Sequence, residues 1–244
     1  MRISAWMSCA LAGAAIAGAG APASAQDIRR PSSSVQELEN EIALYYWLAR
    51  MEGDVDIQGV SGDVDSGYAK SSLGLHYELW ERDSWGGGID LFRMVLEDDP
   101  DVPAGEGDLK TEVALAEAMF IGRTRSGQTT LDFFGGLRWM TLKSRFEAAG
   151  VDEDRSRNYV DPIFGVKAGS ALSEWMHLSL RVDFGGFDIG TKLSYNLIFA
   201  ATVNVSPTVS LGFGWRMFGF EIDDSDHEFD LRLNGPLISA ALGF

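Results

Sequence analysis

His177 and Ser179 are the residues of this sequence whose types and spacing could carry out hydrolytic chemistry. They stand two apart in WMHLSLRVDFGGF, residues 175–187, so an extended strand places both on one face. A serine and a histidine with an acidic orienting group can form an activated nucleophile. Arg181 and Asp183 share that face, and such a row also fits a hydrogen-bonded network without catalysis. Both alternatives depend on the element that positions the row.

That element is a strand with an apolar and a polar face. Met176, Leu178 and Leu180 fall at even positions and the polar residues at odd ones, a period of two that predicts an extended chain. The same alternation recurs along the sequence. Segments 86–97 and 111–122 are less regular, since Arg93 shares parity with Ile89. Long polar connections are expected at 59–67, 98–110 and 146–158 and shorter polar ones at 186–190 and 222–227. Tight turns are expected near 81–85, 123–128, 171–173 and 205–207. The ten predicted strands are 43–58, 68–80, 86–97, 111–122, 129–145, 159–170, 174–185, 191–204, 208–221 and 228–244.

The beginning of the chain is typical of a secretory signal peptide. Met1-Arg2 precedes an apolar, alanine-rich segment that ends at Ala23-Ser24-Ala25. Cleavage after residue 25 removes Cys9, the one cysteine, and with it any disulfide or thiolate metal site. We expect a polar periplasmic leader over 26–42 and a barrel over 43–244, with no cofactor.

Composition narrows the class of protein. The chain has 36 Asp and Glu against 20 Lys and Arg, a balance that excludes nucleic acid as a partner. Its 28 glycines and 11% aromatic residues in short alternating segments favour a sheet protein. No apolar run after Gln26 reaches the length of a membrane-spanning helix.

An even number of strands with long connections at one end and short turns at the other is typical of an outer-membrane barrel. A tilted strand of about ten residues spans the hydrocarbon. An open sheet edge in lipid would leave backbone groups unpaired, so the barrel must close. The sequence therefore predicts an all-β, closed antiparallel transmembrane β-barrel of about ten strands, with eight as the alternative count, in the outer membrane.

Four motifs in the C-terminal half carry a resemblance. Asp161-Pro162-Ile163-Phe164-Gly165, Asp183-Phe184-Gly185-Gly186-Phe187, Gly214-Trp215-Arg216 and Gly235-Pro236 occur in this order. Together they resemble a family of small, largely uncharacterised outer-membrane β-barrel proteins over roughly residues 43–244. The resemblance implies the barrel fold and assigns no catalytic or binding residues.

The last strand carries two further features. Phe244, preceded by apolar residues at alternate positions, resembles the terminal aromatic signal that the barrel-assembly machinery recognises. Phe229, Leu231 and Leu233 have the opposite parity to Phe244, and we expect a bulge near Gly235-Pro236 to reconcile the two halves.

The polar faces of the strands predict a network inside the barrel. At eight strands side chains just fill a barrel, and ten leave little more room, so we expect a plugged, salt-bridged interior, with a narrow polar pore as the alternative. The expected inward residues are Arg50, Glu52, Asp54, Asp56, His76, Glu78, Asp132, Arg138, Lys167, Arg181, Asp183, Arg216, Asp230 and Arg232.

Two other candidate sites remain. The His177 and Ser179 pair resembles part of the site of outer-membrane lipid A deacylases, where a glutamate completes it, but the pair is expected at the periplasmic rim. Acidic segments at Glu97-Asp98-Asp99 with Asp101, and at Asp223-Asp224-Ser225-Asp226 with Glu228, could bridge divalent cations or be solvated loop tips.

These observations lead to one functional expectation with two alternatives. The expectation is a monomeric, non-enzymatic protein with a structural or surface role, surrounded by outer-membrane lipid and lipopolysaccharide. The alternatives are a narrow channel for small polar solutes and a barrel enzyme acting on lipid A.

Overall fold

The computed structural model describes residues 40–244 except 58–59, 82–83, 99–100, 103–104, 107, 149–150 and 225–226. The expected signal peptide and nearly all of the expected leader lie outside these residues. Within the described part of the chain, no helix is long and apolar enough to cross a membrane. The strands are β1 (Asn40–Trp47), β2 (Arg50–Ile57), β3 (Val60–Tyr68), β4 (Ser71–Glu81), β5 (Trp85–Asp98), β6 (Asp101–Val102), β7 (Gly105–Glu106), β8 (Asp108–Ser126), β9 (Thr129–Ala148), β10 (Val151–Ala171), β11 (Met176–Gly186), β12 (Leu193–Asn204), β13 (Val209–Asp224) and β14 (His227–Gly243).

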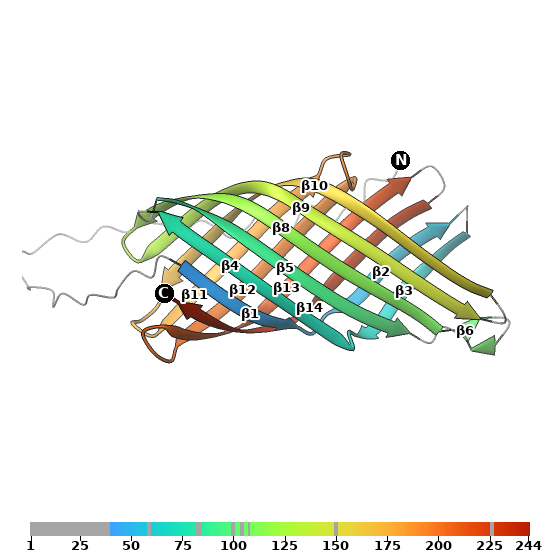
Figure 1. The fold of residues 1–244 in the computed structure, drawn as a ribbon, viewed down its shortest axis with the longest axis horizontal. Helices are drawn as coiled ribbons and strands as arrows, with labels where there is room; N and C mark the ends of the chain where they lie inside the picture. Colours follow the sequence, from blue (N-terminus) through green and yellow to red (C-terminus); the bar gives the residue numbers. More distant parts are fainter. Residues whose placement is uncertain are drawn as a thin grey trace, which may run out of the picture. The chain divides into compact units, whose positions relative to one another are not determined.

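The sheet closes because its first and last strands pair. β1 lies antiparallel to β14 and, on its other side, to β4. β2 continues β1 along β14, and β3 returns beside β2 toward β4, while β6 and β7 form a separate hairpin. The described residues thus form a closed antiparallel barrel of ten strands, as predicted (Figure 1).

Both ends of the described chain meet at one rim of the barrel. The backbone amide of Asn40 donates to the carbonyl of Phe244 at 3.1 Å, and the Phe244 amide returns a bond of 3.0 Å. The connection between β5 and β8, which contains β6 and β7, is at the opposite rim (Figure 1). Since outer-membrane barrels have their short turns in the periplasm and their longer loops outside, the rim with the termini is the periplasmic one.

The wall of the barrel is uneven in height. β8, β9 and β10 have 19, 20 and 21 residues, whereas β11 and β12 have 11 and 12. A spanning strand needs only about 10 residues, so the three long strands extend well beyond the hydrocarbon. The expected connections at 59–67, 98–110 and 146–158 are therefore wrong in large part. They are mostly strand, because a polar segment can keep its backbone ladder after the sheet leaves the membrane.

An apolar band surrounds the outer face of the barrel. Every strand of the closed barrel contributes outward apolar side chains that remain exposed in the isolated chain, which is the surface that hydrocarbon must cover. Its largest members include Leu44, Leu73, Ile89, Phe120, Leu137, Trp139, Phe164, Leu180, Phe184, Phe199, Phe213, Trp215, Ile238 and Leu242.

β14 runs through Gly235-Pro236 without the expected bulge. Its register with β13 is unbroken, and its pairing with β1 and β2 follows one register on both sides of this point. Leu231 and Leu233 are 4% and 0% exposed, so they point inward, whereas Leu242 points outward. One continuous strand therefore accounts for both sets of apolar residues. Leu231 and Leu233 point into an interior that is apolar at their level, and Leu242 points outward.

The discontinuity occurs on the neighbouring strand instead. β1 ends at Trp47 and β2 begins at Arg50, and the Leu48 amide donates to the Pro236 carbonyl at 2.9 Å. The indole nitrogen of Trp47 donates to the Gly235 carbonyl at 3.2 Å. These bonds hold the kinked strand on β14.

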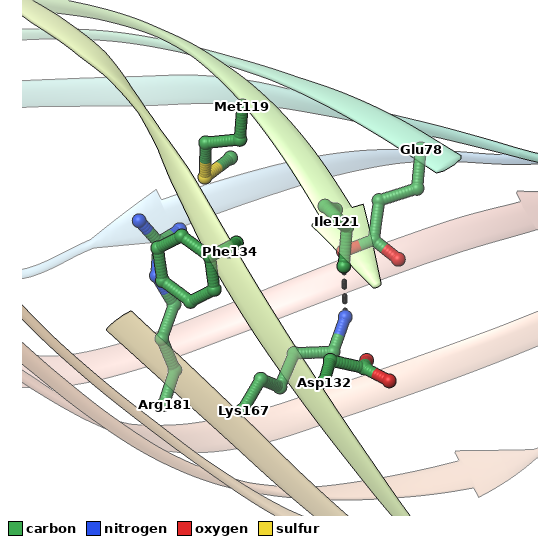
Figure 2. Close-up of a pocket in the computed structure, with 7 residues that line it drawn as sticks. All are labelled: Glu78, Met119, Ile121, Asp132, Phe134, Lys167 and Arg181. Carbon is green, nitrogen blue, oxygen red and sulfur yellow. Dashed lines mark hydrogen bonds and ion pairs between the residues drawn. The ribbon is translucent and has the colours of Figure 1, made fainter. Parts of the chain in front are cut away.

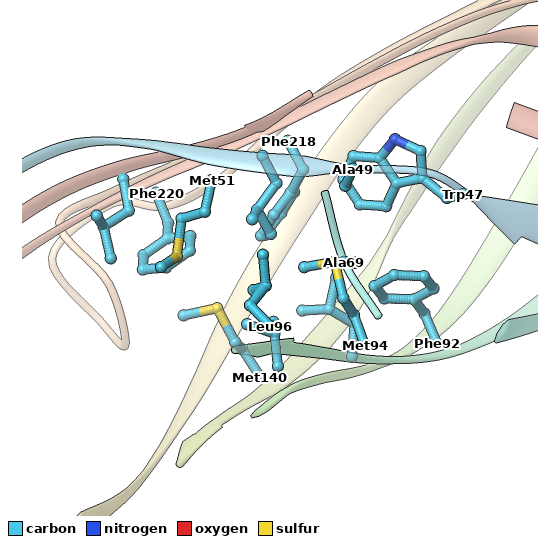
Figure 3. Close-up of a cluster of buried hydrophobic side chains, with 14 of the residues drawn as sticks. Trp47, Ala49, Met51, Ala69, Phe92, Met94, Leu96, Met140, Phe218 and Phe220 are labelled. Carbon is cyan, nitrogen blue, oxygen red and sulfur yellow. The ribbon is translucent and has the colours of Figure 1, made fainter. Parts of the chain in front are cut away.

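The extracellular part of the barrel has a hydrophobic core. Inward side chains from seven strand elements meet there (Figure 3), and the outer face at the same level carries charges such as Arg50 and Lys143. With an apolar interior and a charged outer face, this segment is built like a small water-soluble β-barrel and continues the membrane-embedded part of the barrel. Its buried members are Tyr45, Trp47, Ala49, Met51, Ala69, Phe92, Met94, Leu96, Val113, Leu115, Met140, Phe218, Phe220, Ile222, Leu231, Leu233 and Leu237.

Candidate functional site

A belt of polar side chains, buried except for the half-buried His76 and Lys167, crosses the barrel beneath this hydrophobic core. We define the polar belt as the interconnected inward residues at the level of the apolar outer band. Strands from β1 to β13 supply its members, which are Tyr45, His76, Glu78, Asp90, Glu117, Arg138, Asp161, Lys167, Arg181, Asp183, Ser194, Asn196 and Arg216.

The centre of the polar belt is a ring of two arginines and two carboxylates. Arg138 donates to Glu117 at 2.7 Å and to Asp183, and Arg181 donates to the other oxygens of the same two carboxylates at 2.7 and 2.9 Å. All four side chains are buried. Because each carboxylate accepts from both guanidinium groups, the ring joins β8, β9 and β11 across the interior, which satisfies charges that would otherwise be costly to bury.

A chain of hydrogen bonds continues the polar belt toward β1. Asn196 donates to Asp183 at 3.0 Å and accepts from Arg216 at 3.0 Å. Arg216 also donates to the Tyr45 hydroxyl at 3.1 Å, and that hydroxyl donates to Asp90 at 2.7 Å. The Arg216 guanidinium lies 4.9 Å from the centroid of the Trp47 ring. The polar belt and the hydrophobic core are therefore packed directly against one another.

Gly74 allows the Tyr45 side chain to lie across β4. It is the register partner of Tyr45 on β4, and a Cβ at this position would lie 2.0 Å from the Tyr45 ring. The absence of a side chain lets the ring lie across β4 and reach Asp90. A glycine inside a strand here marks a close packing contact.

His76 lies between two carboxylates at the β4 side of the polar belt. Its Nδ1 is 3.1 Å from Asp90 and its Nε2 is 3.0 Å from Glu78. Glu78 also accepts from Lys167 at 2.5 Å and from the indole of Trp80 at 3.3 Å. The described partners thus occupy both nitrogens of the imidazole.

A small cavity lies below Glu78 on the periplasmic side (Figure 2). It has a volume of about 10 Å³, which is room for about one water molecule. Apolar side chains and charged groups that are already ion-paired form its walls, so it offers no room for a solute. The lining residues are Glu78, Met119, Ile121, Asp132, Phe134, Lys167 and Arg181.

Asp161 ties the connection between β11 and β12 to the barrel. It accepts from the amide and hydroxyl of Thr191 at 2.7 and 2.8 Å, and from the Ser194 hydroxyl at 2.8 Å. β11 ends at Gly186 with a φ of 94°, and the connection begins with Phe187 at 54°, which is a backbone region that disfavours side chains. The motifs at residues 161–165 and 183–187 therefore supply, respectively, the buried carboxylate of Asp161 and the strained turn at Gly186 and Phe187.

The structure divides the predicted inward residues into two groups. The first group lies in the interior and consists of His76, Glu78, Asp132, Arg138, Lys167, Arg181, Asp183 and Arg216. The second group lies on the outer face and consists of Arg50, Glu52, Asp54, Asp230 and Arg232; the side chain of Asp56 is outside the described part.

The placement of the second group corrects the prediction for β2 and β14. Met51 and Leu233, neighbours of Arg50 and Arg232 in sequence, are buried in the hydrophobic core. The strands there are beyond the apolar band, where water covers the outside and apolar side chains fill the inside. Alternation reveals two faces of a strand and does not say which one is inside.

Several members of the polar belt were not predicted. Asp90 and Glu117 lie on β5 and β8, the two strands whose alternation is least regular, and Tyr45 belongs to the apolar residues of the first predicted strand and not to its polar ones. The available signal was Arg93, which shares the outer face with Ile89 and Leu91. Its parity indicates that β5 leaves the apolar band between Leu91 and Arg93, which places Asp90 inside.

His177 and Ser179 lie near the periplasmic rim. Their register partners are Ala171 and Thr202 for His177, and Gly169 and Ala200 for Ser179. Among the described residues, no hydrogen bond joins His177 to Ser179 or either residue to a carboxylate. The geometry lacks the base and the orienting acid of an activated serine.

The acidic segments fall largely outside the described side chains. Glu97 is described and pairs with Lys70 and with Lys110, the latter at 3.2 Å. Asp223 lies 3.8 Å from Lys192. Within the described residues, no group of three His, Cys, Asp or Glu side chains is arranged to hold a metal ion.

Comparison with known proteins supports the fold. No family model matches the chain, and no curated protein matches it. The outer-membrane protease OmpT from Escherichia coli has a similar structure, with 8% identity, a TM-score of 0.51, and coverage of 85% of this chain and 98% of the other. The translocator domain of the autotransporter NalP from Neisseria meningitidis is similar at 13% identity and a TM-score of 0.50, with coverage of 83% and 88%.

The likeness to these outer-membrane proteins and the closed barrel with its apolar band lead to one conclusion. The chain is a bacterial outer-membrane β-barrel protein. At these levels of identity the comparisons concern the fold, so the role of the protein has to be argued from its own interior and surface.

Proposed function

We propose that this protein is a sealed, non-enzymatic barrel that anchors a rigid stalk at the cell surface. The observation that carries this proposal is the burial of the interior at two successive levels. Arg138 and Arg216 in the polar belt are 0% and 1% exposed, and Trp47, Met94 and Leu233 in the hydrophobic core are each 0% exposed. A solute would have to displace buried, hydrogen-bonded arginines and then cross an apolar layer.

The periplasmic side of the interior is more open. Ser179, Ala200 and Thr202 point inward below the polar belt and are only half-buried. Water can therefore reach this part from the periplasm and stops at the polar belt. A blind vestibule of this kind suits a structural barrel better than a channel, which needs two open ends.

The long strands supply the surface part of the proposal. β8, β9 and β10 continue beyond the apolar band with paired backbones and a hydrophobic core, which makes the projecting segment stiff. A stiff projecting segment can present its tip to other molecules without the entropy cost of ordering a loop. We propose that the protein acts as a monomer in this role and that Phe244 serves as its assembly signal.

A permeability assay tests the sealing. Purified protein is folded into phosphatidylcholine vesicles loaded with a small sugar, and lipid-only vesicles serve as the reference. Vesicles that contain folded protein should retain the sugar as long as the reference vesicles do. Fast release that scales with the amount of folded protein would reject the sealed barrel in favour of the narrow channel.

A further inference from the structure

The outer surface of β5, β8 and β9 changes character just above the apolar band. Leu91, Ala116 and Trp139 are register neighbours in one outward row, and this row is apolar. Two outward rows further along, Glu112 lies opposite Lys143. The charged surface thus begins within about 13 Å of the hydrocarbon edge, at roughly 3.3 Å per residue, and the strand tilt reduces the height further.

Among the described side chains of this surface, cations outnumber carboxylates. The Arg93 guanidinium donates two hydrogen bonds of 2.9 Å to the Glu112 carboxylate, and the Arg93 side chain remains 66% exposed. Lys110 bonds Glu97 at 3.2 Å and is 51% exposed. Lys143 is exposed, and among the described residues no carboxylate lies within ion-pair distance of it.

The two described carboxylates on this surface, Glu97 and Glu112, remain ionised near neutral pH. A hydrogen bond from Lys70 lowers the pKa of Glu97, and the bidentate contact of Arg93 lowers the pKa of Glu112. The described side chains of this surface therefore hold five cations against two anionic groups. The cations are Lys70, Arg93, Lys110, Lys143 and Arg145, and we call them, with Glu97 and Glu112, the basic surface.

The opposite wall has the reverse charge at a comparable level. Glu221, Asp230 and Asp54 follow one another in a single outward row of β13, β14 and β2. The whole chain is acidic, with a formal net charge of −16. The excess of cations among the described side chains of β5, β8 and β9 is therefore a local feature and does not reflect the average composition.

We infer that the basic surface binds the phosphate groups of a glycolipid in the outer leaflet of the membrane. Anionic groups of that leaflet lie beside the barrel at the height where the apolar rows end. Arginine and lysine are the side chains that bind phosphate, through paired and point-charge contacts respectively. A freely dissolved anion would be repelled by the net charge of the protein, whereas a lipid is held at the surface by its acyl chains.

The contact geometry suggests how such a lipid is held. Its acyl chains would pack along the row of Leu91, Ala116 and Trp139, and a phosphate would reach Lys143 and the exposed edge of Arg93. This inference requires only the placement in the outer membrane. It does not depend on whether the barrel is sealed, so the two proposals can fail separately.

Binding of a defined lipid tests the inference. Fluorescent bisphosphorylated lipid A is titrated into the folded full-length protein in neutral detergent micelles, and a lipid A that lacks both phosphates is titrated in parallel. One basic side chain near an anionic surface contributes about a fivefold change in affinity. We therefore expect K143Q to weaken binding of the phosphorylated lipid about fivefold and the R93Q/K143Q double variant about 25-fold.

Controls separate a specific site from general attraction. K192Q removes the same charge beside the acidic wall and should leave the affinity unchanged. K143Q breaks no ion pair among the described residues, so its folding, checked by migration of unheated protein on a gel, should match the parent. Equal binding of both lipids, an equal effect of K192Q, or displacement of the lipid by equimolar inorganic phosphate would overturn the inference.

Discussion

Glu117→Gln is the change that probes the polar belt most sharply. Glu117 is 2% exposed and accepts two bonds of 2.7 Å, one from Arg138 and one from Arg181. The glutamine has nearly the same shape but no charge, and its amide group must face a guanidinium. Since removal of one partner of a buried ion pair typically costs about 3–5 kcal/mol, we expect a loss of that size in the free energy of unfolding.

Glu112→Gln is the matched control on the same strand. Glu112 faces outward and pairs with Arg93, whose side chain is 66% exposed, so water can solvate the remaining guanidinium. An exposed pair contributes about 0–1 kcal/mol. Urea-induced unfolding of both variants from lipid vesicles measures the difference. A loss below about 1 kcal/mol for Glu117→Gln, or equal losses for both variants, would refute the assignment of the polar belt as a buried charge network.

Two further predictions concern β11. Leu180→Arg should destabilise folding into bilayers by about 2–4 kcal/mol because Leu180 is on the lipid face, whereas Ser179→Lys should cost less because Ser179 faces the half-open vestibule. Ser179→Ala is the neutral control. A larger loss for Ser179→Lys than for Leu180→Arg would contradict the assignment of these two residues to the inner and the outer face. His177→Ala and Ser179→Ala should leave the lipid A of expressing cells unchanged by mass spectrometry, since neither residue has a described hydrogen bond to the other or to a carboxylate; loss of an acyl chain that requires both residues would contradict this.

The sequence predicted the membrane part of the barrel well for a physical reason. In β11, hydrocarbon requires apolar groups such as Leu180 on the outside, so Arg181 and Asp183 had to be inside. This constraint, together with closure, was enough to place Arg138, Lys167 and Arg216 in the interior. Their partners could not be paired from the sequence, because contacts across the lumen depend on strand order and register.

The extracellular part was predicted less well because the apolar side chains there face the interior and the polar ones face outward, the reverse of the membrane part. Above the apolar band, water contacts the outer face and the interior must exclude it, so Met51 and Leu233 are buried while Arg50 and Arg232 are exposed. The alternation is the same as in the membrane, and only the level of the membrane edge distinguishes the two. Arg93, two residues after the lipid-facing Leu91, marks that edge.

The same reversal explains the missed strand segments. Residues of β3 and the far ends of β9 and β10 are polar and were predicted as connections. Their backbones stay paired, as in the register of Val151 with Ala148, because neighbouring strands extend equally far. Polar composition outside the membrane indicates exposure to water and does not distinguish a loop from the wet face of a strand.

Single-channel recording across a planar bilayer tests the sealed barrel most directly. Protein that is shown to be folded by its altered migration before boiling is added to one side, and current is recorded over a range of voltages. The buried polar belt and the hydrophobic core above it predict a baseline without discrete conductance steps. Reproducible unitary steps that appear with the folded protein and are absent with its boiled form would contradict the sealed interior and favour the narrow channel.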